Sequence, residues 1–219
     1  MTLQDLLDPL LDASQKGFPH HSGPLRRSAV GSQGWNVLNG DLPLPLAVIR
    51  RDALDGNLKW MQGFADGQGV GLAPHGKTTM SPQLFRRQLE AGAWGLTFAT
   101  VGQLRAGVAA GATRCIIANQ VFRAIDLQGI DDLKRAHSGL SVAFLVDSLE
   151  QLALIEAWNA KSKGAQLQDV LLEIGVDGGR TGCRNHEQAL ALAQRMRAST
   201  ATRLVGIECY EGLGATGQT

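Results

Sequence analysis

The feature that most constrains the fold is a regular alternation, from residue 46 onward, of short apolar runs with longer segments of helical periodicity. The runs start roughly 20 to 33 residues apart, which suits one strand plus one helix of an α/β protein. Continuous apolar strands separated by helices indicate a parallel sheet that is covered on both faces. The seven runs occupy residues 46–50, 69–73, 94–98, 114–118, 141–147, 169–175 and 202–209, and the helical segments between them include residues 81–92, 100–110, 148–163 and 185–198.

The number of runs bears on how much of a barrel is present. The rhythm suits a barrel or a doubly wound sheet, and a closed (β/α)8 barrel needs eight strands where seven runs are visible. At about 26 residues per unit, the eighth unit would end roughly 30 to 40 residues beyond Thr219. We therefore expect an incomplete barrel, an N-terminal piece of a longer protein, whose first and seventh strands are unpaired edges. Expressed alone, such a piece is expected to aggregate.

The segment before the barrel has a different texture. Residues 16–45 are rich in glycine and proline and show little periodicity, which is typical of loops. We therefore divide the chain into an N-terminal helix and arm, residues 1–45, and an incomplete barrel, residues 46–219. The opening helix is predicted from Thr2 as N-cap and from leucines at helical spacing, which are Leu3, Leu6, Leu7, Leu10 and Leu11.

Composition excludes several classes of protein. The chain carries 21 basic and 20 acidic side chains, so electrostatics gives no reason to expect nucleic acid or an anionic membrane as partner. The longest uncharged apolar run, residues 139–146, is far shorter than the 18 to 20 or so residues that span a bilayer. The first fifteen residues carry acidic side chains, unlike a secretory or transit peptide, which favours the cytoplasm. The three cysteines, Cys115, Cys183 and Cys209, are widely spaced and are expected to be buried small apolar residues rather than disulfide or zinc ligands.

Lys77 is the residue with the most chemical promise. It directly follows the apolar run at 69–73, and in parallel α/β sheets the carboxyl ends of the strands carry the functional site. Position alone leaves open that Lys77 is a solvated loop lysine. The other five lysines lie in helical segments, at their ends or in the arm, and they are Lys16, Lys59, Lys134, Lys161 and Lys163.

A nucleotide-binding P-loop is the first alternative for this segment. Residues 71–78 match G-x-x-x-x-G-K-[ST], and the run that ends at Asp147 looks like a Walker B strand. A P-loop needs a buried strand before its first glycine and a helix that starts at its lysine. Residues 65–70 are too polar and flexible for that strand, and Pro82 would sit inside the required helix. Nucleotide hydrolysis therefore stays only as a third alternative.

A strand-end lysine also suits a Schiff base with pyridoxal phosphate. Five sequence blocks appear in order, and together they resemble the D-threonine aldolase and D-serine dehydratase family, most of all its bacterial members called amino acid deaminases. These are pyridoxal phosphate enzymes with a (β/α)8 barrel of the alanine racemase type, and the resemblance extends over about residues 44–212. The blocks are PHGKT at 74–78, QLEAGAWG at 88–95, ANQV at 118–121, EIGVDGGRTG at 173–182 and YEG at 210–212.

The resemblance implies a role for five residues. Lys77 would carry the cofactor and, once substrate displaces it, act as the base for the Cα proton. His75 would lie near the cofactor, and Arg180 would hold the phenolate oxygen of its ring. Tyr210, the sole tyrosine, would contact the ring or the phosphate, and Asn119 is a weaker candidate of the same kind. The alternatives without a function are that His75 is a hydrogen-bonded structural histidine, Arg180 a surface arginine at a tight turn, and Tyr210 an aromatic residue of the barrel.

The resemblance also implies parts that this sequence lacks. Family members bind a divalent metal, zinc or manganese, through His and Cys or Asp of a C-terminal β-domain. His137 and His186 do not have ligand spacing and are expected to be solvated helix residues. Gly212 and Gly214 are expected to help bind phosphate, although the G-x-G-x-x-G pattern they begin lacks the helix and acidic residue of a dinucleotide site.

The activity implied by the resemblance is deamination of D-serine or a related D-β-hydroxy amino acid. Loss of the α proton to Lys77 and of the β-hydroxyl, helped by the metal, would release an oxo acid and ammonia. In the aldolase alternative the Cα–Cβ bond breaks instead, giving glycine and an aldehyde. A non-enzymatic carrier of pyridoxal phosphate is a further alternative, but such a single barrel should close its eighth strand within this length. A homodimer is expected for the full-length protein, and the fragment alone is expected to be inactive.

Overall fold

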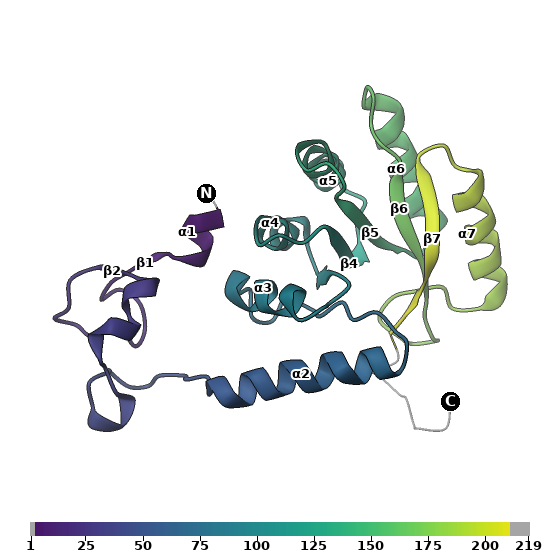
Figure 1. Cartoon of the computed structure of the whole chain (residues 1–219). Helices are drawn as coiled ribbons and strands as arrows, with labels where there is room; N and C mark the ends of the chain where they lie inside the picture. The colour runs from purple at the N-terminus through teal and green to yellow at the C-terminus, as the bar shows by residue number, and fades with distance from the viewer. Residues whose placement is uncertain (1–2, 211–219) are drawn as a thin grey trace.

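The computed structural model of the chain describes residues 3–210. Its centre is a five-stranded parallel sheet in which neighbouring strands follow the order of the sequence. Figure 1 shows helices α3 to α7 on the outer side of this curved sheet, which is the arrangement of a barrel and not of a sheet covered on both faces. The fold is therefore a partial (β/α) barrel. The strands are β3 (Leu96–Phe98), β4 (Arg114–Gln120), β5 (Ser141–Val146), β6 (Gln168–Ile174) and β7 (Thr202–Cys209).

The helices that cover the sheet agree with the sequence periodicity to within a few residues. Each helix that lies between two strands of the sheet provides the crossover that keeps those strands parallel. The four predicted helical segments are all confirmed, as α3, α4, α6 and α7. The bounds are α2 (Arg51–Gly67), α3 (Pro82–Glu90), α4 (Val101–Ala109), α5 (Ala124–Ala136), α6 (Leu149–Lys161) and α7 (His186–Ala198).

Helices α4, α6 and α7 start with the same cap. The side chains of Thr100, Ser148 and Asn185 each accept a hydrogen bond from the backbone N–H of a glutamine three residues later. That glutamine side chain reaches back to the backbone N–H of the residue before the cap, as Gln151 Oε1 does to Asp147 N at 3.2 Å. Since these caps directly follow the carboxyl ends of β3, β5 and the turn after β6, they stiffen the edge of the sheet where a barrel carries its site.

The hydrophobic core lies between the outer face of the sheet and these helices. Phe85 of α3 packs edge to face on Phe98 of β3, with ring centroids 5.5 Å apart. Farther along the sheet, Ile117, Phe144 and Val170 are in register on β4, β5 and β6, and all three are fully buried. This continuous apolar layer holds the strand ends in place.

The first expected strand is absent from the described structure, which corrects the sequence prediction. Residues 46–50 have no strand conformation, and Val48 and Ile49 are 63% and 68% exposed. A parallel strand is stabilised by hydrogen bonds to its neighbours. No described strand pairs with residues 46–50, so their apolar character alone does not make them a strand. At the opposite end of the sheet, β7 pairs with β6 alone among the described strands, as expected for an edge.

The second expected strand is displaced and irregular. Trp94 N donates to Leu72 O at 2.8 Å and Thr97 N donates to Pro74 O at 2.9 Å, so residues 72–76 run alongside β3. Pro74 has no N–H to donate, which interrupts the ladder and explains why the segment is not a regular strand. The segment runs parallel to β3, as predicted for the second strand, although residues 69–73 themselves are not a strand.

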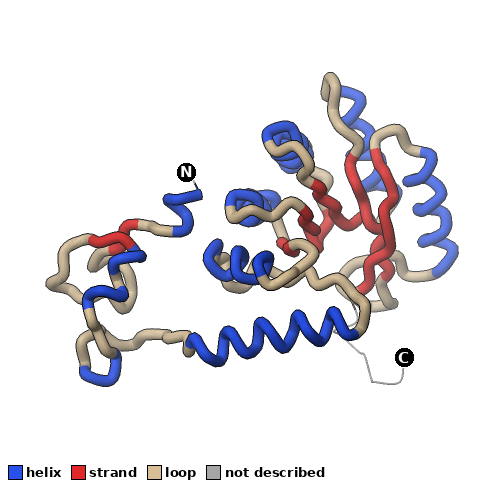
Figure 2. Tube along the Cα trace, in the orientation of Figure 1, coloured by secondary structure: helices blue, strands red, loops and turns tan. Residues whose placement is uncertain are grey.

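The N-terminal segment, residues 3–45 of the described chain, has only short helices, turns and strands. Helix α1 ends before Pro9, so it is shorter than the leucine spacing predicts, and its N-cap candidate Thr2 lies outside the described residues. Phe18 and Trp35 pack edge to face at 5.5 Å, and Gln83 Nε2 of α3 donates to the carbonyls of Leu6 and Leu7. Figure 2 shows the mainly looped path of this segment beside the barrel. Its elements are α1 (Leu3–Leu7), β1 (Leu10–Leu11), β2 (Leu25–Arg26) and three 3-10 turns, η1 (Arg27–Ala29), η2 (Gly31–Gln33) and η3 (Val37–Asn39).

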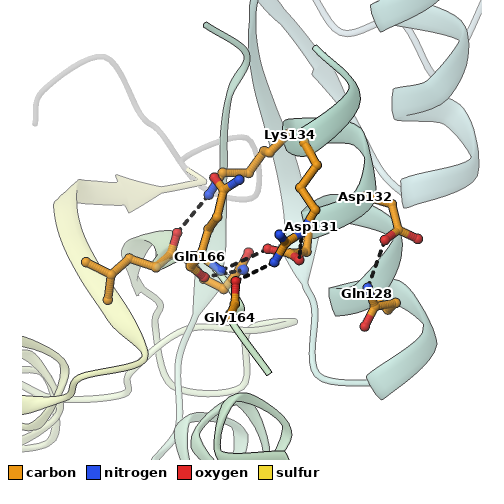
Figure 3. Close-up of polar contacts among 9 residues, drawn as sticks. Gln128, Asp131, Asp132, Lys134, Gly164 and Gln166 are labelled. Atoms are coloured by element: carbon orange, nitrogen blue, oxygen red, sulfur yellow. Dashed lines mark hydrogen bonds and ion pairs between the residues drawn. The ribbon is translucent and has the colours of Figure 1, made fainter. Parts of the chain in front are cut away.

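At the amino end of the sheet a polar cluster ties α5 to the loop before β6. Asp131 is 2% exposed and accepts hydrogen bonds from Arg135 Nε at 2.7 Å and from Gln166 N at 2.9 Å. Lys134 Nζ donates to the carbonyl of Leu167 at 2.7 Å, and Arg135 also donates to the carbonyl of Gly164. Figure 3 shows this cluster, here called the amino-end cluster. It fixes the loop that leads into β6.

Two further sequence predictions concern cysteines and membranes. Cys115 and Cys183 are buried as expected, and burial raises the pKa of the Cys115 thiol to about 12. Cys209 is exposed, which corrects the prediction, because it ends the edge strand β7. Within residues 3–210, none of the helices combines the length and the apolar character needed to cross a bilayer.

Candidate functional site

Lys77 lies in a turn at the carboxyl end of the segment that pairs with β3. Gly76 N donates to Thr97 O at 2.7 Å, and the turn at residues 76–79 follows immediately. A Cβ on Gly76 would lie 2.6 Å from the Phe98 ring and 2.7 Å from the Phe85 ring, so only glycine fits there. The Lys77 side chain is exposed beyond this packed point. The core therefore fixes the backbone of the turn while its amine stays accessible.

The same geometry argues against the P-loop. Helix α3 begins at Pro82 with Ser81 as its N-cap, and not at Lys77. Residues 72–76 are extended along β3, so they do not wrap a phosphate in the way a P-loop does. Asp147, the Walker B candidate, accepts hydrogen bonds from Gly182 N and from Gln120 Nε2. It therefore serves as an anchor for its neighbours.

His75 helps to shape the Lys77 turn. Its Nδ1 accepts a hydrogen bond from Lys77 N at 3.3 Å. Partial burial lowers the pKa of His75, the nearby Lys77 charge lowers it further, and a hydrogen bond with the backbone of Thr97 opposes both. The neutral imidazole is the form that accepts the backbone N–H, so the pKa shift and the hydrogen bond agree.

Asn119 and Gln120 end β4 and differ in what they contact. Asn119 is exposed, and its Nδ2 donates to Ala99 O at the end of β3 at 3.4 Å. Gln120 is half-buried, and its Nε2 donates to Asp147 Oδ2 at 3.1 Å and to Glu173 Oε2. The sequence singled out Asn119, whereas the structure gives its neighbour the richer set of contacts.

Arg180 and Tyr210 come together at the carboxyl ends of β6 and β7. The Arg180 guanidinium carbon lies 5.3 Å from the centre of the Tyr210 ring, within the range of a cation–π contact. Both residues line a cavity of about 180 Å³, together with Glu173 and Cys209. Two of the predicted residues, 30 positions apart in the chain, are thus joined by the fold.

A polar network at the ends of β4, β5 and β6 adjoins the turn that carries Arg180, and sequence reasoning missed most of it. Glu173 is 2% exposed; its Oε1 accepts from Thr181 Oγ1 at 2.5 Å, and its Oε2 accepts from Gln120 Nε2. Asp147 Oδ2 accepts from Gly182 N at 2.9 Å. These five residues, Gln120, Asp147, Glu173, Thr181 and Gly182, are here called the carboxyl-end network. The available signal was a polar residue at the end of each of three successive apolar runs.

The predicted residues share one edge of the sheet. His75 and Lys77 follow the segment beside β3, Asn119 ends β4, and Arg180 and Tyr210 follow β6 and β7. Because the strands are parallel, all five residues follow strand ends on the same, carboxyl edge of the sheet. A hydrogen bond joins Lys77 to His75 beside β3, and a cation–π contact joins Arg180 to Tyr210 beside β7. The two pairs therefore form separate groups, one near the first strand of the described sheet and one near the last.

Two residues were set aside for lack of ligand spacing, and two were expected to help bind phosphate. His186 begins α7 and His137 follows α5, and both are exposed, as expected for solvated residues. Among residues 3–210, no three His, Cys, Asp or Glu side chains are grouped as metal ligands. Gly212 and Gly214, the phosphate candidates, lie outside the described residues.

Comparison with known proteins finds a matching family and several relatives of this chain. The family described as "Alanine racemase, N-terminal domain" matches residues 49–214. The D-threonine aldolase of Arthrobacter sp is 32% identical over 168 residues, which are 77% of this chain and 43% of that protein. The D-threo-3-hydroxyaspartate dehydratase of Delftia sp. (strain HT23) is 31% identical over 172 residues, 78% of this chain and 44% of that protein.

Solved structures give the same result. The crystal structure of D-threonine aldolase from Filomicrobium marinum aligns with a TM-score of 0.68 and 28% identity, over 76% of this chain and 44% of that one. The present chain therefore spans less than half the length of the relatives that it matches.

Proposed function

Because this chain belongs to the family of alanine racemase N-terminal domains, we propose that it is the cofactor-binding barrel of a pyridoxal phosphate lyase that acts on D-β-hydroxy amino acids. The names of its relatives support this substrate class, since they include D-threonine aldolase and D-threo-3-hydroxyaspartate dehydratase. The observation that carries the proposal is an accessible amine, Lys77, at the carboxyl end of the first paired segment of the sheet.

The described residues fit pyridoxal phosphate by their chemistry. The cofactor needs an amine for attachment, a cation for its phenolate or phosphate, and a flat surface against its ring. Lys77, Arg180 and Tyr210 offer these three groups along the carboxyl edge of the sheet, and Arg180 and Tyr210 line a cavity beside the ends of β6 and β7. When bound, the cofactor supplies an electron-withdrawing ring that stabilises negative charge on the substrate Cα.

The residues of this chain then divide the work. Lys77 Nζ would hold the cofactor, and the same amine would accept the proton from the substrate Cα. His75 orients the Lys77 turn through the hydrogen bond to Lys77 N. Arg180 would hold the negative oxygen of the ring, Tyr210 would pack against the ring or its phosphate, and Asn119 would give a polar contact at the end of β4.

We propose deamination as the outcome. The β-hydroxyl leaves as water, and hydrolysis gives an oxo acid and ammonia, with D-serine or a related D-β-hydroxy amino acid as substrate. Aldol cleavage to glycine and an aldehyde is the second candidate, favoured by the 32% identity to D-threonine aldolase. A divalent metal, zinc or manganese, would assist at the hydroxyl. A relative has been studied in a metal-free form, which supports a metal in that protein.

We also propose a cytoplasmic homodimer with a small-molecule substrate. The balanced charge of the chain, +1 overall, gives no support to nucleic acid or an anionic membrane as partner. The division into an arm, residues 1–45, and a barrel from residue 46 onward is supported by the family match, which starts at residue 49.

The test uses the complete protein loaded with pyridoxal phosphate. Borohydride reduction followed by digestion and mass spectrometry should find the cofactor on Lys77, and Lys77→Arg should carry none. D-serine, D-threonine, D-threo-3-hydroxyaspartate and ATP are then supplied separately, and ammonia, glycine, aldehyde and phosphate are measured.

Each outcome has a clear meaning. Ammonia from a D-β-hydroxy amino acid supports deamination, and glycine with an aldehyde supports aldol cleavage. Attachment to Lys77 without turnover of any amino acid would indicate a carrier. Phosphate from ATP with no attachment at Lys77 would refute the proposal in favour of nucleotide hydrolysis.

A further inference from the structure

The turn that carries Arg180 is closed by backbone contacts at its neck. Gly175 N donates to Cys183 O at 2.9 Å, and Cys183 N donates to Glu173 O at 2.8 Å. A Cβ on Gly182, which has a φ of +92°, would lie 2.4 Å from Gly175 N. The two arms of the neck therefore touch backbone to backbone, with no room for a side chain.

The carboxyl-end network also contacts this turn, through hydrogen bonds to Thr181 and Gly182. Thr181, the residue after Arg180, donates its hydroxyl to Glu173, and Gly182 donates its backbone N–H to Asp147. The two carboxylates come from neighbouring strand ends, and the Gln120 amide donates to both. The turn is therefore tied by side chains to β4, β5 and β6 at once.

The burial of Glu173 indicates that its hydrogen bonds to the turn do more than fill volume in the protein interior. Removing a carboxylate from water is costly unless hydrogen bonds replace the water, and apolar residues would fill the same volume at less cost. Here Gln120 and Thr181 satisfy Glu173 as neutral donors, which leaves its charge close to the turn. The guanidinium of Arg180 is left exposed, beside the Tyr210 ring.

We propose that Glu173 and Asp147, linked by Gln120, are positioning residues that hold the Arg180 turn in the geometry needed to bind the ring of the cofactor. This inference rests on the proposed function. A cation fixed before the cofactor arrives binds without the cost of ordering a loop, whereas a mobile turn bears that cost at every binding event. The acids act through Thr181 and Gly182 and do not themselves contact substrate.

Thr181 offers a matched pair of variants for the test. Thr181→Val keeps the shape of the side chain and removes the hydroxyl that Glu173 accepts, whereas Thr181→Ser keeps the hydroxyl. Glu173→Gln is a second variant that keeps the volume and removes the charge. Asp131→Asn, in the amino-end cluster, is the control for loss of an equally buried carboxylate that is remote from the turn.

The first measurement needs no cofactor. Hydrogen exchange of the peptide that covers residues 175–184 is followed in the complete apoprotein. Thr181→Val and Glu173→Gln are expected to speed exchange about tenfold, the effect of losing one hydrogen bond to a charged group. Thr181→Ser and Asp131→Asn should exchange there at the wild-type rate.

The second measurement is the dissociation constant of pyridoxal phosphate, from the absorbance of the reconstituted protein. Thr181→Val and Glu173→Gln should weaken binding about tenfold, while Thr181→Ser and Asp131→Asn should bind as wild type does. Melting temperatures of all variants are recorded, so that a general loss of stability is recognised by its appearance in Asp131→Asn as well.

The two proposals fail in different ways. If the wild-type protein takes up no cofactor at Lys77, the proposed function is refuted, and hydrogen exchange still decides whether the acids hold the turn. If the wild-type protein binds the cofactor and Thr181→Val matches it in exchange and in binding, the positioning role is refuted and the proposed function stands. Equal weakening of binding by Asp131→Asn would refute the positioning role as well.

Discussion

The two ends of the sheet carry similar buried acids in different settings. Asp131 at the amino end and Glu173 at the carboxyl end are each 2% exposed. Asp131 pairs with Arg135 of its own helix and caps the backbone of Gln166, so its charge is neutralised within a closed cluster. Glu173 accepts hydrogen bonds from the neutral donors Gln120 and Thr181, and the Arg180 guanidinium lies over the Tyr210 ring. Asp131 therefore serves only to stabilise the fold, because its charge is paired with Arg135. At the carboxyl end the Arg180 charge is not paired with Glu173, so it is available to bind a ligand.

The largest effect is expected at the neck of the Arg180 turn. Gly182→Ala places a Cβ 2.4 Å from Gly175 N on a backbone with a φ of +92°. We expect it to lower the free energy of unfolding by about 3 kcal/mol or more and to displace Arg180. Urea denaturation measures the first effect and cofactor titration the second.

Gly178→Ala is the matched control within the same turn. Its φ is +70°, but no atom lies within 4 Å of the added Cβ. We expect a loss of only about 1 kcal/mol, from the backbone conformation alone. Equal effects of the two substitutions would show that the neck contacts do not matter.

Asp131→Asn should destabilise the amino-end cluster and leave the cofactor site at the carboxyl end of the sheet unchanged. The Arg135 contact loses its charge partner in a buried setting, and we expect the free energy of unfolding to fall by about 2 kcal/mol. Urea denaturation is the measurement, and cofactor binding should be unchanged. A change in cofactor affinity would contradict the separation of the two ends.

Asn185→Ala tests the cap of α7, which follows the Arg180 turn. The Asn185 side chain accepts the Gln188 N–H at 2.9 Å, and its loss should cost about 1 kcal/mol. Asn185→Ser keeps an acceptor and should restore most of that stability. Thermal denaturation of both variants decides the point, and a Ser variant as unstable as the Ala variant would argue against the cap.

The smallest effect is a pH dependence at His75. Its pKa is lowered in the folded state, chiefly by burial, so the unfolded state takes up the proton first on acidification. The stability that His75 contributes is therefore complete above its ordinary pKa of 6.5 and is lost as the pH falls through the folded-state pKa. Urea midpoints at pH 5 and pH 7 should differ less in His75→Asn than in the wild-type protein, and an unchanged difference would contradict this.

Much of the fold could be predicted because the signal was local. The helical segments and five of the seven strand runs follow from periodicity within each segment, and Lys77 could be singled out because strand ends collect functional groups. The caps at Thr100, Ser148 and Asn185 were equally readable, as Ser, Thr or Asn followed three residues later by Gln, but were not used.

The failures have one physical cause. Residues 46–50 look like a buried strand, yet a strand exists only where a neighbour accepts its hydrogen bonds. Cys209 reads as a buried residue but lies on an edge strand. Glu173 reads as an ordinary charge within an apolar run, and its partners Gln120 and Thr181 come from other parts of the chain. None of these facts is contained in a short stretch of sequence.

The amino-acid sequence by itself determined the βα rhythm, the helix starts, and an amine at a strand end, because each depends on interactions between residues close along the chain. The tertiary structure alone decided which segments became strands, which acids are buried, and which arginine faces a tyrosine 30 positions away. Those outcomes depend on contacts between distant residues, whose hydrogen bonds and burial form only when the chain has folded.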